Sequence, residues 1–190
     1  MKSLMKNTKQ GLKPRIRQET SSDYDDVYNL IKEAFSNTEY ADGDEQDLVV
    51  KLRNSDVFIP ELSMVAEVYG QIVGHIILTK TTIGEGYSSL KSLVLAPVSV
   101  LPEFQNLGIG TMLINEAHKL ATLMGYGSVV LIGHAEYYPK FGYEKASKFG
   151  IKFKFKVPDE AAMVIELWQG ALEGVNGYVK LPEAFGPQYI

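Results

Sequence analysis

The sequence predicts a single α/β (α+β) domain, and three observations support this prediction. The chain has 190 residues, 45% of them hydrophobic, which is typical of one compact domain with its own core. Segments with apolar residues at helical spacing alternate with segments that have strand patterns, as expected for a protein that contains both helices and strands. The sequence contains neither an internal repeat nor a linker that would divide it.

Two helices are predicted after a short strand near the start of the domain. Alternating polar and apolar residues at 15–19 predict the strand. Ser21 and Ser22 are candidate N-caps of the first helix, whose first turn is acidic. Its apolar stripe consists of Val27, Leu30, Ile31, Ala34 and Phe35. After a polar break at residues 37–43, the spacing of Leu48, Val49 and Leu52 predicts a second helix.

The middle of the chain is predicted to be rich in strands. Residues 61–68 and 71–84 have strand patterns, and the short connection Tyr69-Gly70 indicates a hairpin between them. A third strand pattern runs from residue 88 to residue 100 and is interrupted by Ala96-Pro97. Because proline cannot donate to a strand ladder, we expect a β-bulge or a strand end at this point.

The second half of the chain predicts a long helix followed by shorter elements. The helix is expected at residues 108–124, with Gly125 placed to end it. Its predicted buried stripe consists of Ile109, Met112, Leu113, Ala117, Leu120, Ala121 and Met124. A strand at 128–132, an aromatic segment at 134–143 and a final strand at 161–168 follow. The Gly- and Pro-rich end of the chain is expected to be an ordered extension with a short strand at Tyr178-Val179.

The composition excludes several classes of function. The chain has no cysteine, which excludes a disulfide framework, a thiolate metal site and a cysteine nucleophile. Its net charge of -4 argues against a nucleic-acid partner, because phosphate binding needs clustered lysines and arginines. No run approaches the ~20 apolar residues that span a membrane. We therefore expect a cytoplasmic protein with neither a nucleic-acid nor a membrane partner.

The first thirteen residues form a basic segment. They contain Lys2, Lys6, Lys9 and Lys13 but no apolar stretch of the kind found in a signal peptide. We expect residues 1–13 to be a disordered tail.

The most informative segment is the glycine loop at residues 105–110. It follows a strand and opens an amphipathic helix, so its backbone amides meet the positive end of the helix dipole and can bind an anion. The third glycine of a dinucleotide-binding loop and the Gly-Lys-Ser/Thr of a P-loop are both missing. The two glycines would equally suit a tight turn that begins a helix and binds nothing.

Three segments in order resemble the GNAT superfamily of N-acetyltransferases. Residues 105–110 resemble its Gln/Arg-x-x-Gly-x-Gly/Ala motif, residues 97–103 its bulged central strand, and residues 137–143 its Phe-Tyr-x-Lys-x-Gly-Phe segment. Within the superfamily, residues 44–53, 130–134 and 166–172 resemble the YhbS-like branch. The resemblance runs from about Arg15 to Phe185.

The resemblance implies a fold and a reaction. The fold would be a mixed, mostly antiparallel central sheet with a splayed, bulged strand and helices on both faces. The N-acetyltransferase domain would span residues 14–170, with an extension at 171–190 packed on it, in a monomer or homodimer. Acetyl-CoA would be the acyl donor, without a metal, for direct attack by a primary amine of an unidentified small molecule or peptide.

The resemblance also implies the residues that bind acetyl-CoA. The pantetheine arm would enter the wedge made by the bulge and pair with the backbone of Val98 and Val100. Many relatives carry a basic residue in the glycine loop, whereas Asn106 and Leu107 are neutral here, so phosphate binding would rest more on amides and the helix dipole. The implied set is Val98, Ser99, Val100, Gln105, Asn106, Leu107, Gly108, Ile109, Gly110 and Thr111.

Two residues are candidates for catalysis. Tyr138 matches the catalytic tyrosine of the resembling motif and is expected to be the general acid that protonates the departing CoA thiolate. Tyr137 is the alternative if the register differs by one residue. Glu45 precedes the apolar residues of its helix by three, four and seven positions, which directs it toward the core face and makes it a candidate base. It could equally be an acidic residue favoured by the helix dipole. Glu103 and His134 are further candidates near the loop.

Other residues are expected to be structural. The three histidines have no ligand-like spacing, and His75 and His118, unlike the candidate His134, are expected at surface or satisfied core positions. Trp168 is expected in the core. One other class of function stays open, namely a non-catalytic acyl-CoA-binding sensor that keeps the glycine loop but lacks the acid near the sulfur.

Overall fold

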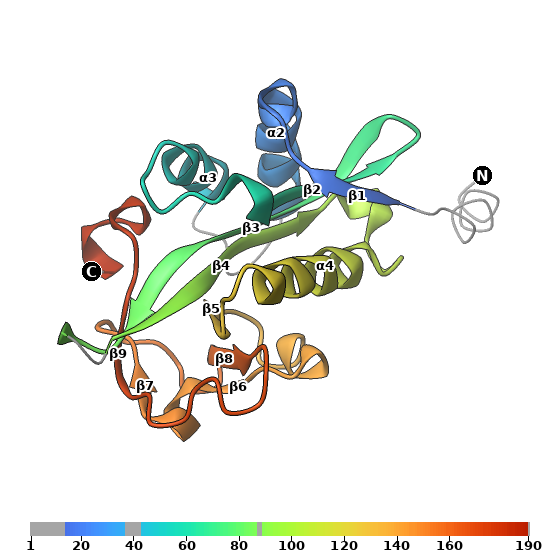
Figure 1. The fold of residues 1–190 in the computed structure, drawn as a ribbon. Coiled ribbons are helices and arrows are strands. Elements are labelled where there is room, and N and C mark those ends of the chain that lie inside the picture. Colours follow the sequence, from blue (N-terminus) through green and yellow to red (C-terminus); the bar gives the residue numbers. More distant parts are fainter. Residues whose placement is uncertain (1–13, 37–42, 87–88, 190) are drawn as a thin grey trace.

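A computed structural model describes residues 14–36, 43–86 and 89–189 (Figure 1). Three features of the sequence lie outside the described residues. They are the basic segment 1–13, the predicted break at 37–43 apart from Gly43, and the predicted strand start at residue 88. None of the helices in these ranges has the length and apolarity needed to traverse a bilayer.

The predicted elements are present, with small changes of boundary. The helices are α2 (Tyr24–Phe35), α3 (Glu45–Arg53) and α4 (Ile109–Leu123), and the N-terminal strands are β1 (Arg15–Gln18) and β2 (Ser63–Val68). The other strands are β3 (Gln71–Ile83), β4 (Leu90–Val100), β5 (Ser128–Ile132), β6 (Glu144–Lys145), β7 (Ile151–Lys152), β8 (Ala162–Glu166) and β9 (Gly177–Lys180).

The turn between β2 and β3 shows how the local sequence fixes a hairpin. Tyr69 and Gly70 both have positive φ, 51° and 80° respectively. Two consecutive left-handed residues give a turn whose twist matches that of antiparallel strands. The predicted hairpin is confirmed.

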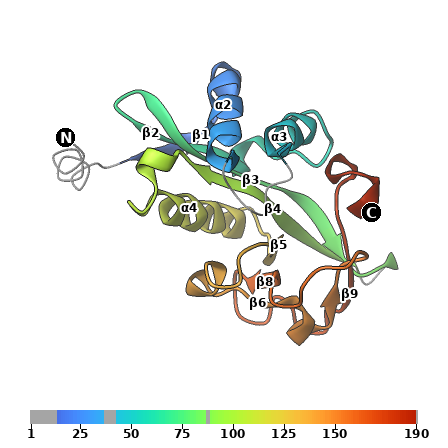
Figure 2. The same cartoon turned by 180° about the vertical axis from the view of Figure 1, so that it is seen from behind.

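The described residues form one mixed sheet of nine strands, with the main order β1-β2-β3-β4-β5-β8-β6. The pairs are antiparallel except β4 with β5 and β7 with β9. Helices α2 and α3 cover one face of β3 and β4, and α4 covers the other, as the two opposite views show (Figures 1 and 2). The predicted fold class is confirmed.

Strand β4 contains the predicted bulge. Ile76 of β3 pairs with Val98, but Leu78 pairs with Leu95, so β4 carries one extra residue at Ala96-Pro97. Beside the bulge, β4 and β5 pair only at Leu93–Val129 and Val94–Val130, whereas β5 continues to residue 132 along β8. The two parallel strands therefore part, and this leaves a wedge.

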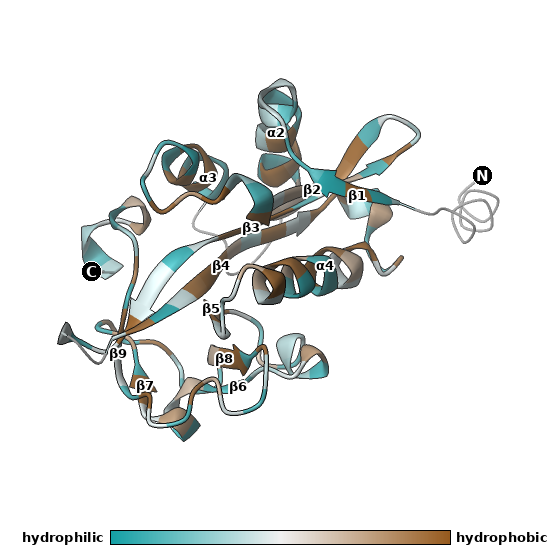
Figure 3. Cartoon of the chain, in the orientation of Figure 1, coloured by the Kyte–Doolittle hydropathy of each residue, from teal (hydrophilic) through white to brown (hydrophobic). Residues whose placement is uncertain are grey.

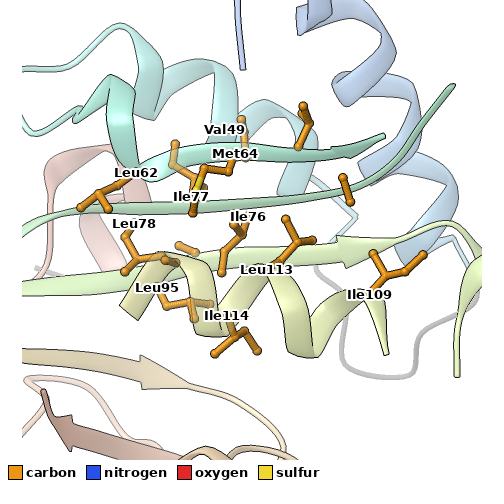
Figure 4. Close-up of a cluster of buried hydrophobic side chains, with 14 of the residues drawn as sticks. Val49, Leu62, Met64, Ile76, Ile77, Leu78, Leu95, Ile109, Leu113 and Ile114 are labelled. Carbon is orange, nitrogen blue, oxygen red and sulfur yellow. The ribbon is translucent and has the colours of Figure 1, made fainter. Parts of the chain in front are cut away.

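The main core lies between the sheet and its helices, and the apolar faces of the elements turn inward (Figure 3). Leu113 of α4 points toward β3 and β4 in Figure 4, and Ile109, Leu113 and Ile114 are all almost fully buried. The prediction that Met112 and Met124 belong to this stripe is wrong, because they are 39% and 40% exposed. Met112 precedes Leu113 by one residue, which turns it by about 100° around a helix of 3.6 residues per turn.

The C-terminal residues add strand and core to the domain. The predicted short strand is β9, which pairs with β3 at Thr82–Lys180 and Ile83–Val179. Leu172, Val179 and Leu181 are buried in a second hydrophobic cluster with Ile83 and Val130.

The prediction that Trp168 lies in the core is wrong, because its side chain is 44% exposed. Strand β8 ends at Glu166, two residues earlier than predicted. The Glu166 carboxylate accepts a hydrogen bond from the Leu172 N–H at 2.7 Å, and this bond closes a turn that carries Trp168 to the surface.

Candidate active site

A cleft of about 1480 Å³ opens where β4 and β5 part. Its walls come from β4, the glycine loop, the end of β5 and the turn Tyr138–Phe141, and further residues from α3 and the C-terminal segment close its other end. A cleft this large exceeds the ~300–1,000 Å³ of most small-molecule pockets, so two substrates can lie in it together.

The glycine loop forms an anion cradle at the start of α4. Asn106 and Gly108 have positive φ, 61° and 80°, and α4 begins at the next residue, Ile109. The first amides of a helix have no partner within it and carry the positive end of its dipole. A Cβ atom on Gly108 would have no neighbour within 4 Å, so open space adjoins this glycine in the cleft wall.

Eight of the ten predicted cofactor residues line the cleft, namely Val98, Val100, Gln105, Asn106, Gly108, Ile109, Gly110 and Thr111. Ser99 and Leu107 do not. Ser99 is 3% exposed and pairs with His75, and alternation along β4 turns its side chain away from those of Val98 and Val100. Leu107 packs partly buried against the main core.

Successive backbone groups of β4 point alternately toward β3 and toward the wedge. The N–H of Leu101 donates to Val73 of β3 at 3.0 Å, so the preceding residue, Val100, faces the wedge. The carbonyl of Val100 accepts a hydrogen bond from the Gln105 side chain at 3.1 Å. This bond ties the strand to the glycine loop.

Tyr138 lies in the cleft wall and is 7% exposed. Its ring packs against Tyr143 at 5.6 Å and against Tyr137 at 5.2 Å. Burial raises the pKa of the Tyr138 hydroxyl well above its usual value, so this phenol keeps its proton at every pH at which the protein would be assayed. A Cβ atom on Gly133 would overlap the Tyr138 ring, which makes this glycine a requirement for the position of the ring.

Tyr137 reaches the anion cradle and carries Lys140 on its ring, and neither residue was among those predicted to bind the cofactor. The Tyr137 hydroxyl lies 2.8 Å from the place of a Cβ on Gly110. The Lys140 ammonium lies 3.8 Å from the centre of the Tyr137 ring, a cation–π contact. The lysine of the Phe-Tyr-x-Lys-x-Gly-Phe segment was the feature of the sequence that could have indicated a cation beside Tyr137.

Glu45 is the first residue of α3 and lines the cleft. Its side chain is half-buried, and Oε2 is shielded from solvent. Of the two other candidates, His134 lines the cleft, whereas Glu103 is exposed and outside its lining. No group of three or more His, Asp or Glu in the described ranges is placed to hold a metal ion.

A buried polar cluster fixes the other end of α3. Arg53, its last residue, donates two hydrogen bonds to Glu19, at 3.0 and 2.7 Å, and Ser63 donates a third at 2.5 Å. Burial by itself would raise the pKa of Glu19, but hydrogen bonds from His75 and Arg53 bring it down to about 2. Burial lowers the pKa of His75, so Arg53 is the cation that balances Glu19.

His118 is also structural. It is hydrogen-bonded to the Tyr143 hydroxyl at 2.9 Å, and burial lowers its pKa to about 4, so the imidazole is neutral at neutral pH. Through Tyr143, it supports the aromatic group that surrounds Tyr138.

Parted parallel strands beside an anion cradle, with a protonated phenol in the cleft wall, define an acyltransferase. Residues 15–146 match the family described as acetyltransferase (GNAT) domain. The chain therefore belongs to the GNAT acetyltransferase family and is an acyltransferase.

Relatives over most of the chain agree with this assignment. The chain is 35% identical over 140 residues to the "Uncharacterized N-acetyltransferase YjhQ" of Escherichia coli, covering 73% of this chain and 75% of that protein. A crystal structure of the Escherichia coli GNAT family N-acetyltransferase YhbS in complex with CoA is 27% identical, with a TM-score of 0.78, covering 92% of this chain and 93% of that one. A GNAT family acetyltransferase from Brucella melitensis in complex with acetyl-CoA is 28% identical, with a TM-score of 0.74, covering 92% and 99%.

Proposed function

We propose that the protein transfers an acetyl group from acetyl-CoA to a primary amine of a small molecule or peptide, by direct attack with both substrates bound. The observation that carries this proposal is the anion cradle beside the parted strands β4 and β5. The CoA and acetyl-CoA in the two similar structures support it.

The cradle supplies the contacts that a pyrophosphate needs. The amides of Ile109, Gly110 and Thr111 are at the start of α4, where helix geometry leaves them free to bind an anion. Lys140 adds the positive charge that the neutral loop lacks. We propose that Lys140 and the Tyr137 hydroxyl lie beside the phosphates, and that the backbone of Val98 and Val100 pairs with the pantetheine arm.

The reaction needs a site for each proton. The amine nitrogen bonds to the acetyl carbon, and the carbon–sulfur bond breaks, leaving its electron pair on the sulfur. An ammonium substrate loses one proton to a base before it attacks. The attacking nitrogen loses a second proton afterwards, and this second proton ends on the sulfur. We propose that Glu45, directly or through water, accepts the first proton.

We propose that Tyr138 donates a hydrogen bond to the departing thiolate. Complete transfer of its proton would be unfavourable, since a phenol has a reference pKa of ~10 and a thiol ~8.5, a difference worth about 2 kcal/mol. Burial raises the pKa of Tyr138 further and increases this cost. A neutral, buried donor still stabilises the negative charge that develops on the sulfur.

Thermal unfolding with CoA tests this proposal. Ligand at ~100 times its dissociation constant should add about 2.7 kcal/mol to the free energy of unfolding. Gly108→Asp should abolish this stabilisation, because a carboxylate would occupy the anion cradle. Gly125→Asp is the matched control, since Gly125 has a similar φ of 84° and open space around its Cβ position but ends α4 instead of beginning it.

A failure of millimolar CoA to stabilise the wild type would refute the proposal, as would equal stabilisation of both variants. Binding of CoA without CoA release from acetyl-CoA, across a broad panel of amines, would instead indicate the acyl-CoA sensor.

A further inference from the structure

One wall of the cleft is built by residues outside the family match, which ends at residue 146. Phe153, Phe155 and Val157 come from the connection between β7 and β8, and Phe185 and Tyr189 come from the C-terminal segment. The C-terminal turn Glu183–Phe185 packs against α3, and both views of the fold place the chain end beside this helix (Figures 1 and 2). Glu45, the first residue of this helix, lines the same cleft as these residues.

Three of these aromatic rings form a connected series. Phe153 and Phe155 meet edge to face with centroids 5.8 Å apart, and Phe155 and Tyr189 meet at 4.8 Å and 75°. Phe153 is almost fully buried, whereas Phe155 and Tyr189 are partly exposed. An edge-to-face series holds each ring in a fixed orientation, so the exposed parts of Phe155 and Tyr189 form a preformed apolar surface in the cleft.

Several other residues of the cleft lining are also apolar. Phe35 and Leu48 lie on the helical side, and Pro158 and Leu181 on the other. Among the described residues of the lining, the carboxylates are those of Asp44, Glu45 and Glu160, and the ammonium groups apart from Lys140 are those of Lys51 and Lys156. The two lysines offset two of the three carboxylates.

These features discriminate among amines. A sugar would place several hydroxyl groups against phenylalanine, leucine and proline side chains, where unpaired polar groups are costly. A polyamine has no ring to lie against the aromatic surface. An amine with one cationic group on a flat apolar body fits both the aromatic surface and the carboxylate of Glu45 at the start of α3.

We propose that the acceptor is a primary amine on an aromatic body, bound with its ring against Phe155 and Tyr189 and its amine toward Glu45. This inference rests on the proposed acetyl transfer and names the substrate class of the same site. The aromatic wall, which the family match does not include, then determines acceptor specificity.

Binding to the CoA-loaded protein tests the inference without requiring turnover. Titration of 2-phenylethylamine into the protein saturated with CoA should give saturable binding, by calorimetry or thermal shift, at least ten times tighter than that of spermidine or glucosamine. Phe155→Leu and Tyr189→Leu should each weaken this binding about 2- to 10-fold, the range expected for loss of an aromatic contact, and leave the affinity for CoA unchanged. Phe149→Leu is the matched control, because Phe149 packs against the same cluster but is outside the cleft lining.

The outcomes separate the two proposals. Stabilisation by CoA together with tighter binding of spermidine or glucosamine would overturn the aromatic acceptor but leave acetyl transfer in place. Equal effects of Phe149→Leu and Tyr189→Leu would also overturn it, as would absence of 2-phenylethylamine binding at millimolar concentration. In an assay of CoA release from acetyl-CoA, the same two cleft variants should raise KM for 2-phenylethylamine and leave KM for acetyl-CoA unchanged.

Discussion

Replacement of Glu19 by glutamine should reveal how strongly the buried cluster holds α3. Folding lowers the pKa of Glu19 from 4.5 to about 2, and at about 1.4 kcal/mol per pH unit this corresponds to about 3 kcal/mol of stability. Because the pKa is lower in the folded state, the contribution is fully present above pH 4.5 and is lost as the pH falls toward 2. Removing one partner of a buried ion pair costs ~3–5 kcal/mol, so the two magnitudes agree.

Urea unfolding from pH 7 to pH 2.5 measures this contribution. Glu19→Gln should lower the free energy of unfolding by about 3 kcal/mol at pH 7, and the gap from the wild type should narrow steadily below pH 4.5. Glu116→Gln is the control, because Glu116 pairs only with exposed Lys119 at 3.2 Å and should change stability by less than ~1 kcal/mol. A gap that is small at pH 7, or that stays constant down to pH 2.5, would show that Glu19 is not held as a buried carboxylate.

Three further substitutions test the site. Glu45→Gln should lower turnover most at low pH, where the unprotonated amine is scarcest, and leave CoA affinity near normal; an unchanged pH–rate profile would return Glu45 to a helix-start role. Tyr138→Phe should reduce kcat at least ~10-fold with little change in CoA binding or Tm, and wild-type turnover would remove the hydroxyl from the mechanism. Gly133→Ala should destabilise the protein by ~1–3 kcal/mol through overpacking against Tyr138 and also reduce kcat, whereas unchanged stability would show that the ring has room to move.

The features that the sequence predicted correctly depend on neighbouring residues. The hairpin at Tyr69-Gly70 requires only two consecutive residues in left-handed conformation, and the bulge at Ala96-Pro97 follows from the missing proline N–H. The start of α4 beside Gly108 is equally local. Met112 and Trp168 were misplaced because burial depends on which face of an element meets the rest of the protein, and their own segments do not contain that information.

In the candidate site, too, the features fixed by neighbouring residues were predicted and those that depend on the whole fold were not. The glycine loop, Tyr138 and Glu45 were predicted from short segments, and all of these residues except Leu107 line the cleft. The contact of Lys140 with Tyr137 is local, within the turn Tyr138–Phe141 and its N-cap. What the sequence could not show is that the Tyr137 hydroxyl lies beside Gly110 at the start of α4. The aromatic wall was missed because Phe155 and Tyr189 are 34 residues apart in the sequence and meet only in the folded chain.

Strand β4 supplies one wall of the cleft but no acid or base, so these groups are on other elements. The residues of β4 that line the cleft are Val94, Leu95, Ala96, Pro97, Val98 and Val100, and none of their side chains can exchange a proton. This agrees with our proposal that the base comes from α3, as Glu45, and the hydrogen-bond donor to the sulfur from the turn that carries Tyr138. Different clusters hold these two elements, since Arg53 and Glu19 secure α3, whereas His118 and Tyr143 support Tyr138. Loosening the Glu19 cluster should consequently impair activation of the amine while the affinity for CoA stays intact.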